Sequence, residues 1–155
     1  MSRAACAALL LAAGAAVPAA AQGPAGAWVG SYVCAQGLTA LDLTLDSPDG
    51  TTVTGIFHFA TLPPHRAVPE GCFRVTGRFD KATGTVTLSP AGWLLRPAGF
   101  VTVGLSGAVS PDGTMLAGRV YGPWCDTFTV RRAAALPPRA AACTPRPDLV
   151  ASAAH

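Results

Sequence analysis

The sequence contains little charge and few of the residues that long helices favour. Only 12% of its 155 residues are Asp, Glu, Lys or Arg, and Glu70 and Lys81 are its sole Glu and Lys. Together with 14 Pro and 17 Gly, this composition excludes a coiled coil. No apolar run reaches the roughly 18 residues of a spanning helix, which excludes a polytopic membrane protein. A formal net charge of +3 is close to neutral, and it does not indicate the basic surface that binds nucleic acid.

The first 21 residues have the pattern of a secretory signal peptide. Arg3 supplies a positive charge, an apolar run extends from Ala4 to Val17, and small residues precede Gln22. We expect cleavage after Ala21 and a mature protein in a bacterial periplasm or outside the cell, with no transmembrane segment. The alternative, an uncleaved anchor, would require a longer apolar run.

Four cysteines follow the predicted cleavage site: Cys34, Cys72, Cys125 and Cys143. An even number in an exported chain predicts two disulfides, for which three pairings exist. No Cys-x-x-Cys occurs, and no His lies at zinc-ligand spacing from a Cys, so we expect no metal site. The sequence also contains no phosphate-binding Gly loop and no cofactor fingerprint, so no cofactor is predicted.

From Trp28 to Arg132 the sequence alternates with a period of two, and turn residues interrupt it about every ten positions. Ser-Pro-Asp-Gly occurs at both 47–50 and 110–113, where Pro and Gly suit tight turns. We therefore expect eight strands. They are Trp28–Ala35, Leu38–Asp46, Thr51–Ala60, Cys72–Phe79, Thr85–Ser89, Phe100–Val109, Met115–Val120 and Cys125–Arg132.

Alternation gives each strand one apolar and one polar face, so the antiparallel sheet must close on itself or pair with a second sheet. Hairpins in sequence order favour an all-β fold, an eight-stranded meander closed or nearly closed into a small barrel. A β-sandwich is the alternative. The expected core is Leu41, Leu43, Leu45, Val53, Phe57, Phe59, Phe73, Val75, Phe79, Val86, Leu88, Val101, Val103, Leu105, Val109, Leu116, Val120, Phe128 and Val130.

The sequence therefore divides into three predicted segments. Residues 1–21 form the signal peptide, residues 22–132 the β-barrel domain, and residues 133–155 an Ala/Pro-rich, low-complexity tail. The tail contains no expected core residue, and we expect it to be mobile except around Cys143.

Barrel closure favours one disulfide pairing. In a closed meander the last strand lies antiparallel to the first, which brings Cys34 near Cys125, and Cys72 then pairs with Cys143 by elimination. Strict alternation places Cys34 on the apolar face and Cys125 on the polar face, so this pairing requires a bulge or a splayed strand end.

Gly26-Ala27-Trp28 opens the first expected strand. This start resembles the G-x-W opening of lipocalins and, more loosely, that of avidin-like barrels. The resemblance implies that Trp28 plugs one end of the barrel and that the cavity holds a small, often apolar ligand. Barrel closure would also place Arg131 or Arg132 near Trp28. The longer string from Trp28 to Gly37, W-x-G-x-Y-x-C-x-Q-G, is similar to uncharacterised exported bacterial domains and implies no activity.

Residues suited to catalysis are few. His58 lies between two Phe residues on the polar face of its strand, where we expect it to be solvated. His65, Arg66 and Glu70 lie in the longest polar loop and have the chemistry to bind an anion or move protons, although a Pro-stiffened connector is the favoured interpretation. No nucleophile elbow is present. We therefore expect a protein that is not an enzyme.

Features suited to binding are better represented. Ala91–Gly99 is expected to be a connector, and its large apolar residues either cap the core or face a partner. The candidate rim site consists of Trp93, Arg96, Trp124, Tyr121 and Arg66, because Trp and Arg are typical interface anchors. The predicted function is non-catalytic binding of a small apolar ligand or a protein partner. The alternatives are a structural or inhibitory partner of an envelope protein without an internal ligand and, third, a hydrolase.

Overall fold

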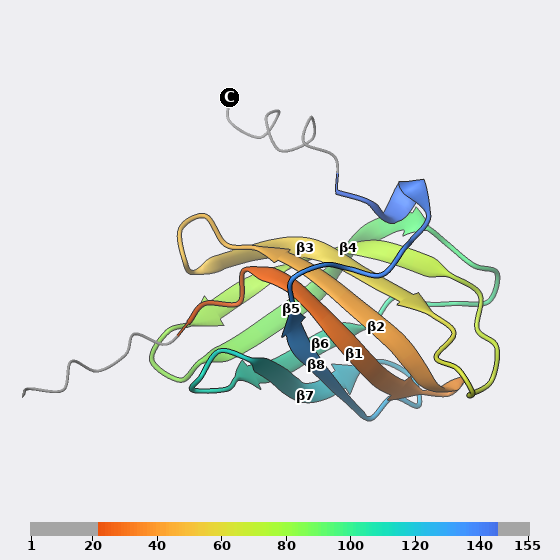
Figure 1. Ribbon diagram of the computed structural model, residues 1–155, viewed down its shortest axis with the longest axis horizontal. Helices are drawn as coiled ribbons and strands as arrows, with labels where there is room; N and C mark the ends of the chain where they lie inside the picture. The colour runs from red at the N-terminus through yellow and green to blue at the C-terminus, as the bar shows by residue number, and fades with distance from the viewer. Residues whose placement is uncertain (1–21, 146–155) are drawn as a thin grey trace, which may run out of the picture.

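The computed structural model describes residues 22–145, and the predicted signal peptide lies outside this range. This part of the chain forms eight antiparallel strands and one short 3-10 helix (Figure 1). The strands are β1 (Gly26–Cys34), β2 (Gly37–Asp46), β3 (Thr52–Ala60), β4 (Gly71–Asp80), β5 (Thr85–Leu95), β6 (Gly104–Val109), β7 (Met115–Tyr121) and β8 (Thr127–Ala133). The 3-10 helix covers Ala141–Cys143. No helix in residues 22–145 has the length and hydrophobicity of a membrane span.

Each strand pairs with its neighbour in sequence, and β1 also pairs with β8, so the sheet closes into a barrel. Trp28 lies opposite Arg132 and Tyr32 opposite Phe128 in the closing ladder. The all-β prediction and the closed meander are therefore confirmed, and the sandwich alternative is wrong.

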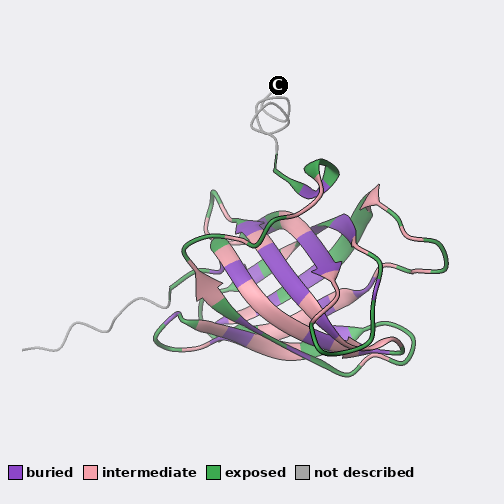
Figure 2. Cartoon of the chain, turned by 45° about the vertical axis from the view of Figure 1, so that its right-hand side comes forward, coloured by how far each residue is buried: buried purple, intermediate pink, exposed green. Residues whose placement is uncertain are grey.

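The barrel core consists of the side chains that alternation places inward. Figure 2 shows buried and exposed residues alternating along the strands. All of the expected core residues are buried except Val101, which is 57% exposed. Gly77 shows how closely the strands approach, since a Cβ atom there would collide with the Thr87 carbonyl oxygen on β5. Glycine thus removes a clash at this position.

Two of the expected strand boundaries that are wrong lie near the open end of the barrel, and the later start of β6 explains the exposure of Val101. Strand β5 continues to Leu95, so Ala91–Leu95 is strand rather than connector. The ladder between β4 and β5 shifts register beside Pro90, a position where a bulge accommodates proline. Strand β6 begins at Gly104 rather than Phe100. Because residues 100–103 lie outside any strand, alternation does not assign Val101 to the core.

One end of the barrel is closed by short turns, at 47–51, 81–84 and 110–114, and by the segment that precedes β1. Trp28 is fully buried at this end, and its indole nitrogen donates to the Pro24 carbonyl. The guanidinium of Arg132 lies over the Trp28 ring, 4.2 Å from its centroid. Of the two arginines expected near Trp28, Arg132 is the one in contact.

The chain after β8 crosses the outside of the barrel (Figure 1), and we call residues 134–145 the C-terminal strap. Its 3-10 helix contacts β4 and β5, and the Cys72–Cys143 disulfide joins it to β4. The second disulfide joins Cys34 to Cys125. Both bridges follow the pairing favoured by barrel closure. Alternation does not extend to Cys125, because β8 starts two residues later at Thr127.

Candidate functional site

Four connectors converge at the end of the barrel opposite Trp28: residues 35–36, 61–70, 96–103 and 122–126. They surround a cavity of about 540 Å³, which we call the open-end cup. Its volume lies within the range of small-molecule sites, which is roughly 300–1,000 Å³. The lining residues are Tyr32, Cys34, Ala35, Gln36, Phe57, Phe59, Arg66, Ala67, Val68, Pro69, Phe73, Gly99, Phe100, Val101, Val103, Pro123, Trp124 and Cys125.

Aromatic side chains from the strands line the inner part of the cup. Phe57 stacks on Phe73 with ring centroids 4.6 Å apart, and Tyr32 meets Phe57 edge-on at 5.2 Å. Phe100, from the connector after β5, stacks on Phe59 at 5.3 Å. The strand rings are at most 4% exposed, so they form a packed floor of the cup, and half-buried Phe100 lies over them.

A few polar groups interrupt this apolar lining. The Gln36 amide donates to the Tyr32 hydroxyl over 2.9 Å, and Arg66 is exposed in the connector after β3. Burial raises the pKa of Tyr32, while the Gln36 bond opposes that shift, so the phenol keeps its proton at neutral pH. An apolar cavity with few polar groups is typical of sites that orient a small ligand.

Trp124 occupies an unusual backbone position at the mouth of the cup. Its φ is 58°, it is 86% exposed, and it is the third residue of a turn closed by Cys125 N–H bonding to the Gly122 carbonyl. Turns of this kind favour Gly at that position, because positive φ is costly for other residues. The disulfide to Cys34 fixes the next residue. The indole of Trp124 is therefore held at the mouth of the cup, exposed to solvent, and does not contribute to the core.

The five expected rim residues are separated in the structure. Arg66 and Trp124 both line the cup. Trp93 is half-buried on β5 against Phe73, with Arg96 over its ring at 5.9 Å from the centroid. Tyr121 is 61% exposed at the end of β7.

Sequence reasoning missed the lining role of Tyr32 and Phe100. It assigned the cup phenylalanines only to the core. The sequence did contain a signal for this lining, because inward-facing aromatic residues lie close to the open-end connectors.

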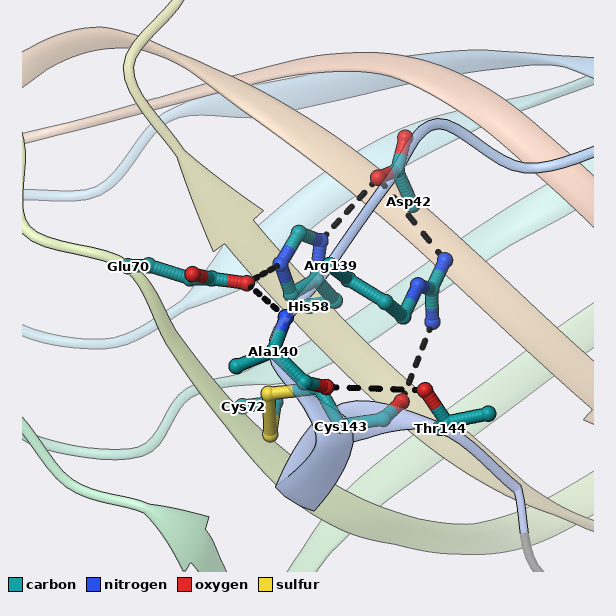
Figure 3. Close-up of a disulfide and its surroundings, with 8 residues drawn as sticks. All are labelled: Asp42, His58, Glu70, Cys72, Arg139, Ala140, Cys143 and Thr144. Atoms are coloured by element: carbon teal, nitrogen blue, oxygen red, sulfur yellow. Dashed lines mark hydrogen bonds and ion pairs between the residues drawn. A yellow bond between two sulfur atoms is a disulfide. The ribbon is translucent and has the colours of Figure 1, made fainter.

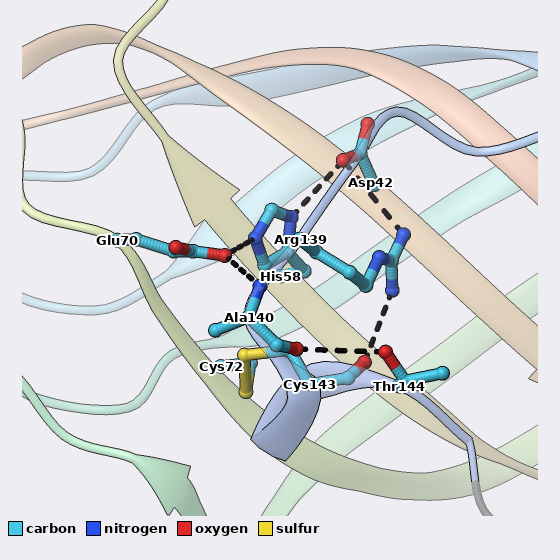
Figure 4. Close-up of polar contacts among 8 residues, drawn as sticks. All are labelled: Asp42, His58, Glu70, Cys72, Arg139, Ala140, Cys143 and Thr144. Atoms are coloured by element: carbon cyan, nitrogen blue, oxygen red, sulfur yellow. Dashed lines mark hydrogen bonds and ion pairs between the residues drawn. A yellow bond between two sulfur atoms is a disulfide. The ribbon is translucent and has the colours of Figure 1, made fainter.

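A second polar cluster lies on the outer face of β2 and β3, beneath the strap (Figures 3 and 4). His58 points outward as alternation predicts, but it is 3% exposed, so the expected solvated histidine is wrong. Its Nδ1 lies 3.0 Å from Asp42 Oδ2 and its Nε2 lies 2.9 Å from Glu70 Oε1. Asp42 is also buried, at 5% exposure. The strap covers a face that the strand pattern alone marks as polar.

The strap contributes its own groups to this cluster. The Ala140 amide donates to Glu70 Oε1 over 2.6 Å, and this bond, followed by the one to His58, lowers the pKa of Glu70. Arg139 has a side chain only 5% exposed, with Nη2 3.8 Å from Asp42 Oδ2. Burial lowers the pKa of Arg139, and the charges of Asp42 and Glu70 oppose this effect. The cluster therefore fastens the strap by charge as well as by the disulfide.

The connector of residues 61–70 divides between the two sites. Its Arg66 lines the cup, Glu70 belongs to the buried cluster, and His65 is exposed. The three residues therefore form no common acid–base or anion site. Comparison with protein-family models, curated proteins and solved structures finds no match to this chain. The molecule is a small disulfide-bonded β-barrel with one end closed by short turns and a cavity at the other end.

Proposed function

We propose that this protein is an exported, non-catalytic binding protein that holds a small, largely apolar molecule in the open-end cup. The observation that carries the proposal is the convergence of all four connectors of one end on an aromatic cavity of about 540 Å³. Two disulfides support export, because such bridges persist in oxidising compartments. The predicted signal peptide and the full burial of Trp28 at the closed end agree with this assignment.

The chemistry of the lining suggests the type of ligand. Half-buried Phe100 offers flat apolar surface above the buried Phe57 and Phe59, and half-buried Gln36 offers hydrogen bonds at one wall. We expect a ligand with a hydrocarbon or aromatic body and one polar group. Burial of apolar ligand surface favours the free energy of binding by about 25 cal/mol per Å², before the entropy lost on association is subtracted.

The first test is mass spectrometry of protein purified from cells that export it. A non-covalent mass present in the native spectrum and lost on denaturation supports a bound ligand. The fluorescent probe N-phenyl-1-naphthylamine then tests the site. Ala67→Trp places a bulky ring in the cup and should abolish probe binding, whereas Ala82→Trp, in a closed-end turn, should leave it unchanged. Equal binding by both variants would contradict the proposal.

The alternative function is a protein partner at the open end, with no internal ligand. It is favoured by the exposure of Val101, Tyr121 and Trp124, the large apolar side chains that lie exposed in the described part of the chain. All three belong to or adjoin the open-end connectors. Replacement of Tyr121, which does not line the cup, should impair capture of an envelope protein while probe binding persists.

A hydrolase ranks third. His58 and Asp42 do form a His–acid pair, but both ring nitrogens of His58 already face carboxylates and the strap covers the ring. The pair does not belong to the lining of the cup. This placement supports a structural role and a non-catalytic protein.

A further inference from the structure

The buried cluster beneath the strap contains side chains that bind metals. His58 Nε2, Glu70 Oε1 and Cys143 Sγ lie within 4.8 Å of one another. Cys72 adds a second sulfur, bonded to that of Cys143 and placed directly opposite His58 in the ladder between β3 and β4. Figure 3 shows these four side chains gathered between β3, β4 and the strap. Two sulfurs, an imidazole and a carboxylate are ligand types that zinc accepts in tetrahedral sites.

The imidazole is oriented as a metal ligand usually is. Asp42 Oδ2 accepts a hydrogen bond from His58 Nδ1, which leaves Nε2 as the atom that faces Glu70 and the Cys143 sulfur. A carboxylate on the far nitrogen fixes the tautomer of a ligating histidine and increases its basicity. In the disulfide-bonded chain, a hydrogen occupies the 2.9 Å between Nε2 and Glu70 Oε1. A metal ion would replace that hydrogen.

The charge of the surroundings also suits a cation bound by several anions. Two thiolates and the Glu70 carboxylate carry three negative charges, and Zn²⁺ neutralises two of them. Arg139 is buried beside Asp42 and has Nε and Nη2 atoms that make no hydrogen bond to any described residue. With the buried Asp42 carboxylate counted, two negative charges remain beside the bound ion, and the positive charge of Arg139 offsets one of them.

We propose that His58, Glu70, Cys72 and Cys143 form a zinc site that is available only when the Cys72–Cys143 disulfide is reduced. A dithiol reductant supplies two electrons and two protons, so its own sulfurs become a disulfide and the two cysteines become thiols. Zinc then binds as both thiol protons and the hydrogen between His58 and Glu70 leave. In the oxidised chain only His58 and Glu70 offer ligand atoms, so zinc binding is weak.

This assignment goes beyond ligand binding in the cup and gives the strap a second fastening. The disulfide holds the strap on β4 under oxidising conditions, and the metal would hold it there under reducing ones. The cup lies at the barrel end and shares none of these four residues. The zinc proposal can therefore fail while the proposed function stands, and the reverse also holds.

The experiment is a zinc titration of the purified protein, air-oxidised or reduced with a phosphine that does not bind zinc. We expect one zinc per reduced chain, bound on the order of 100-fold more tightly than by the oxidised chain, because two ligands are gained. Cobalt in place of zinc should give a thiolate charge-transfer band. Circular dichroism should show the reduced, zinc-loaded chain folded.

Variants separate the assigned site from incidental thiol binding. His58→Ala and the double variant Cys72→Ser with Cys143→Ser should lose the tight binding, and the exposed His65→Ala should keep it. Asp42→Asn should weaken it by about 10-fold or more, because Asp42 orients the imidazole. Equal zinc affinity in both redox states, or tight binding that survives His58→Ala, would each overturn the proposal.

Discussion

The guanidinium of Arg132, on the last strand, lies 4.2 Å from the ring centroid of Trp28, on the first strand. The same side chain donates to the carbonyls of Gly113, Ala25 and Gly23 at 2.8, 2.6 and 3.0 Å. Arg132 thus joins β8, the turn before β7 and the segment before β1. It therefore links the first and last strands of the barrel and covers the Trp28 ring, which fills the closed end.

Replacement of Arg132 by Lys should destabilise the protein, although the charge is kept. Lysine retains the cation near Trp28 but cannot bond three carbonyls that lie in different directions. We expect a loss of about 1–3 kcal/mol in the free energy of unfolding, measured in urea. Arg131→Lys is the matched control, since Arg131 is exposed on the same strand. Similar losses of unfolding free energy from both variants would contradict this role of the Arg132 guanidinium.

Trp124→Gly should separate stability from binding. Glycine adopts the φ of 58° without steric cost, so relief of strain should outweigh the added freedom of the unfolded chain. We expect unchanged or higher stability, by up to about 1 kcal/mol, together with weaker probe binding. Trp124→Ala, which retains the strain, should weaken binding without that gain. Strong probe binding by both variants would show that the indole does not contact ligand.

Loss of the Cys34–Cys125 disulfide should affect both stability and the cup. The bridge spans 91 residues, and removal of a bridge over a long loop costs about 2–5 kcal/mol. Its removal also releases the backbone at position 125, which lines the cup beside Trp124. We therefore expect the double Ala variant to bind the probe several-fold more weakly. Cys72→Ala with Cys143→Ala is the control, because that bridge lies outside the barrel and should leave probe affinity unchanged.

The attachment of the strap should weaken in acid through Glu70. The pKa of Glu70 in the folded protein lies below its ordinary value of 4.5. The stabilisation is therefore fully present above pH 4.5 and is lost as the pH falls through the lower, folded value. Glu70→Gln should show a smaller difference in unfolding free energy between pH 6 and pH 3 than the parent protein. An unchanged difference would mean that other carboxylates, such as Asp112 with its pKa near 2, account for the acid effect.

Most of the barrel was predictable because its inner face follows a simple period. Leu41, Phe57 and Val130 alternate with polar residues, and burial requires that alternation in a closed antiparallel sheet. The prediction failed at Val101, where the chain leaves the ladder. No local pattern marks the point at which a strand stops pairing.

The two sites were predictable to different degrees. Arg66 and Trp124 were expected at a rim because their residue types are typical of binding surfaces, and both line the cup. The environment of His58 could not be predicted. Its cover comes from Arg139 and Ala140, in a low-complexity segment that the Cys72–Cys143 disulfide and the contacts with Asp42 and Glu70 hold against the barrel. Contacts between residues so far apart leave no local pattern in a single sequence.

The most direct test of ligand binding in the cup is to map amide chemical shifts by nuclear magnetic resonance during titration with N-phenyl-1-naphthylamine. We expect changes at the amides of residues 34–36, 66–68, 99–103 and 124–125. We expect no change at the amides of the closed-end turns at 47–51, 81–84 and 110–114. Saturable shifts restricted to the four connectors would establish the cup as the binding site. Shifts at the closed end, or none at saturating probe, would contradict it.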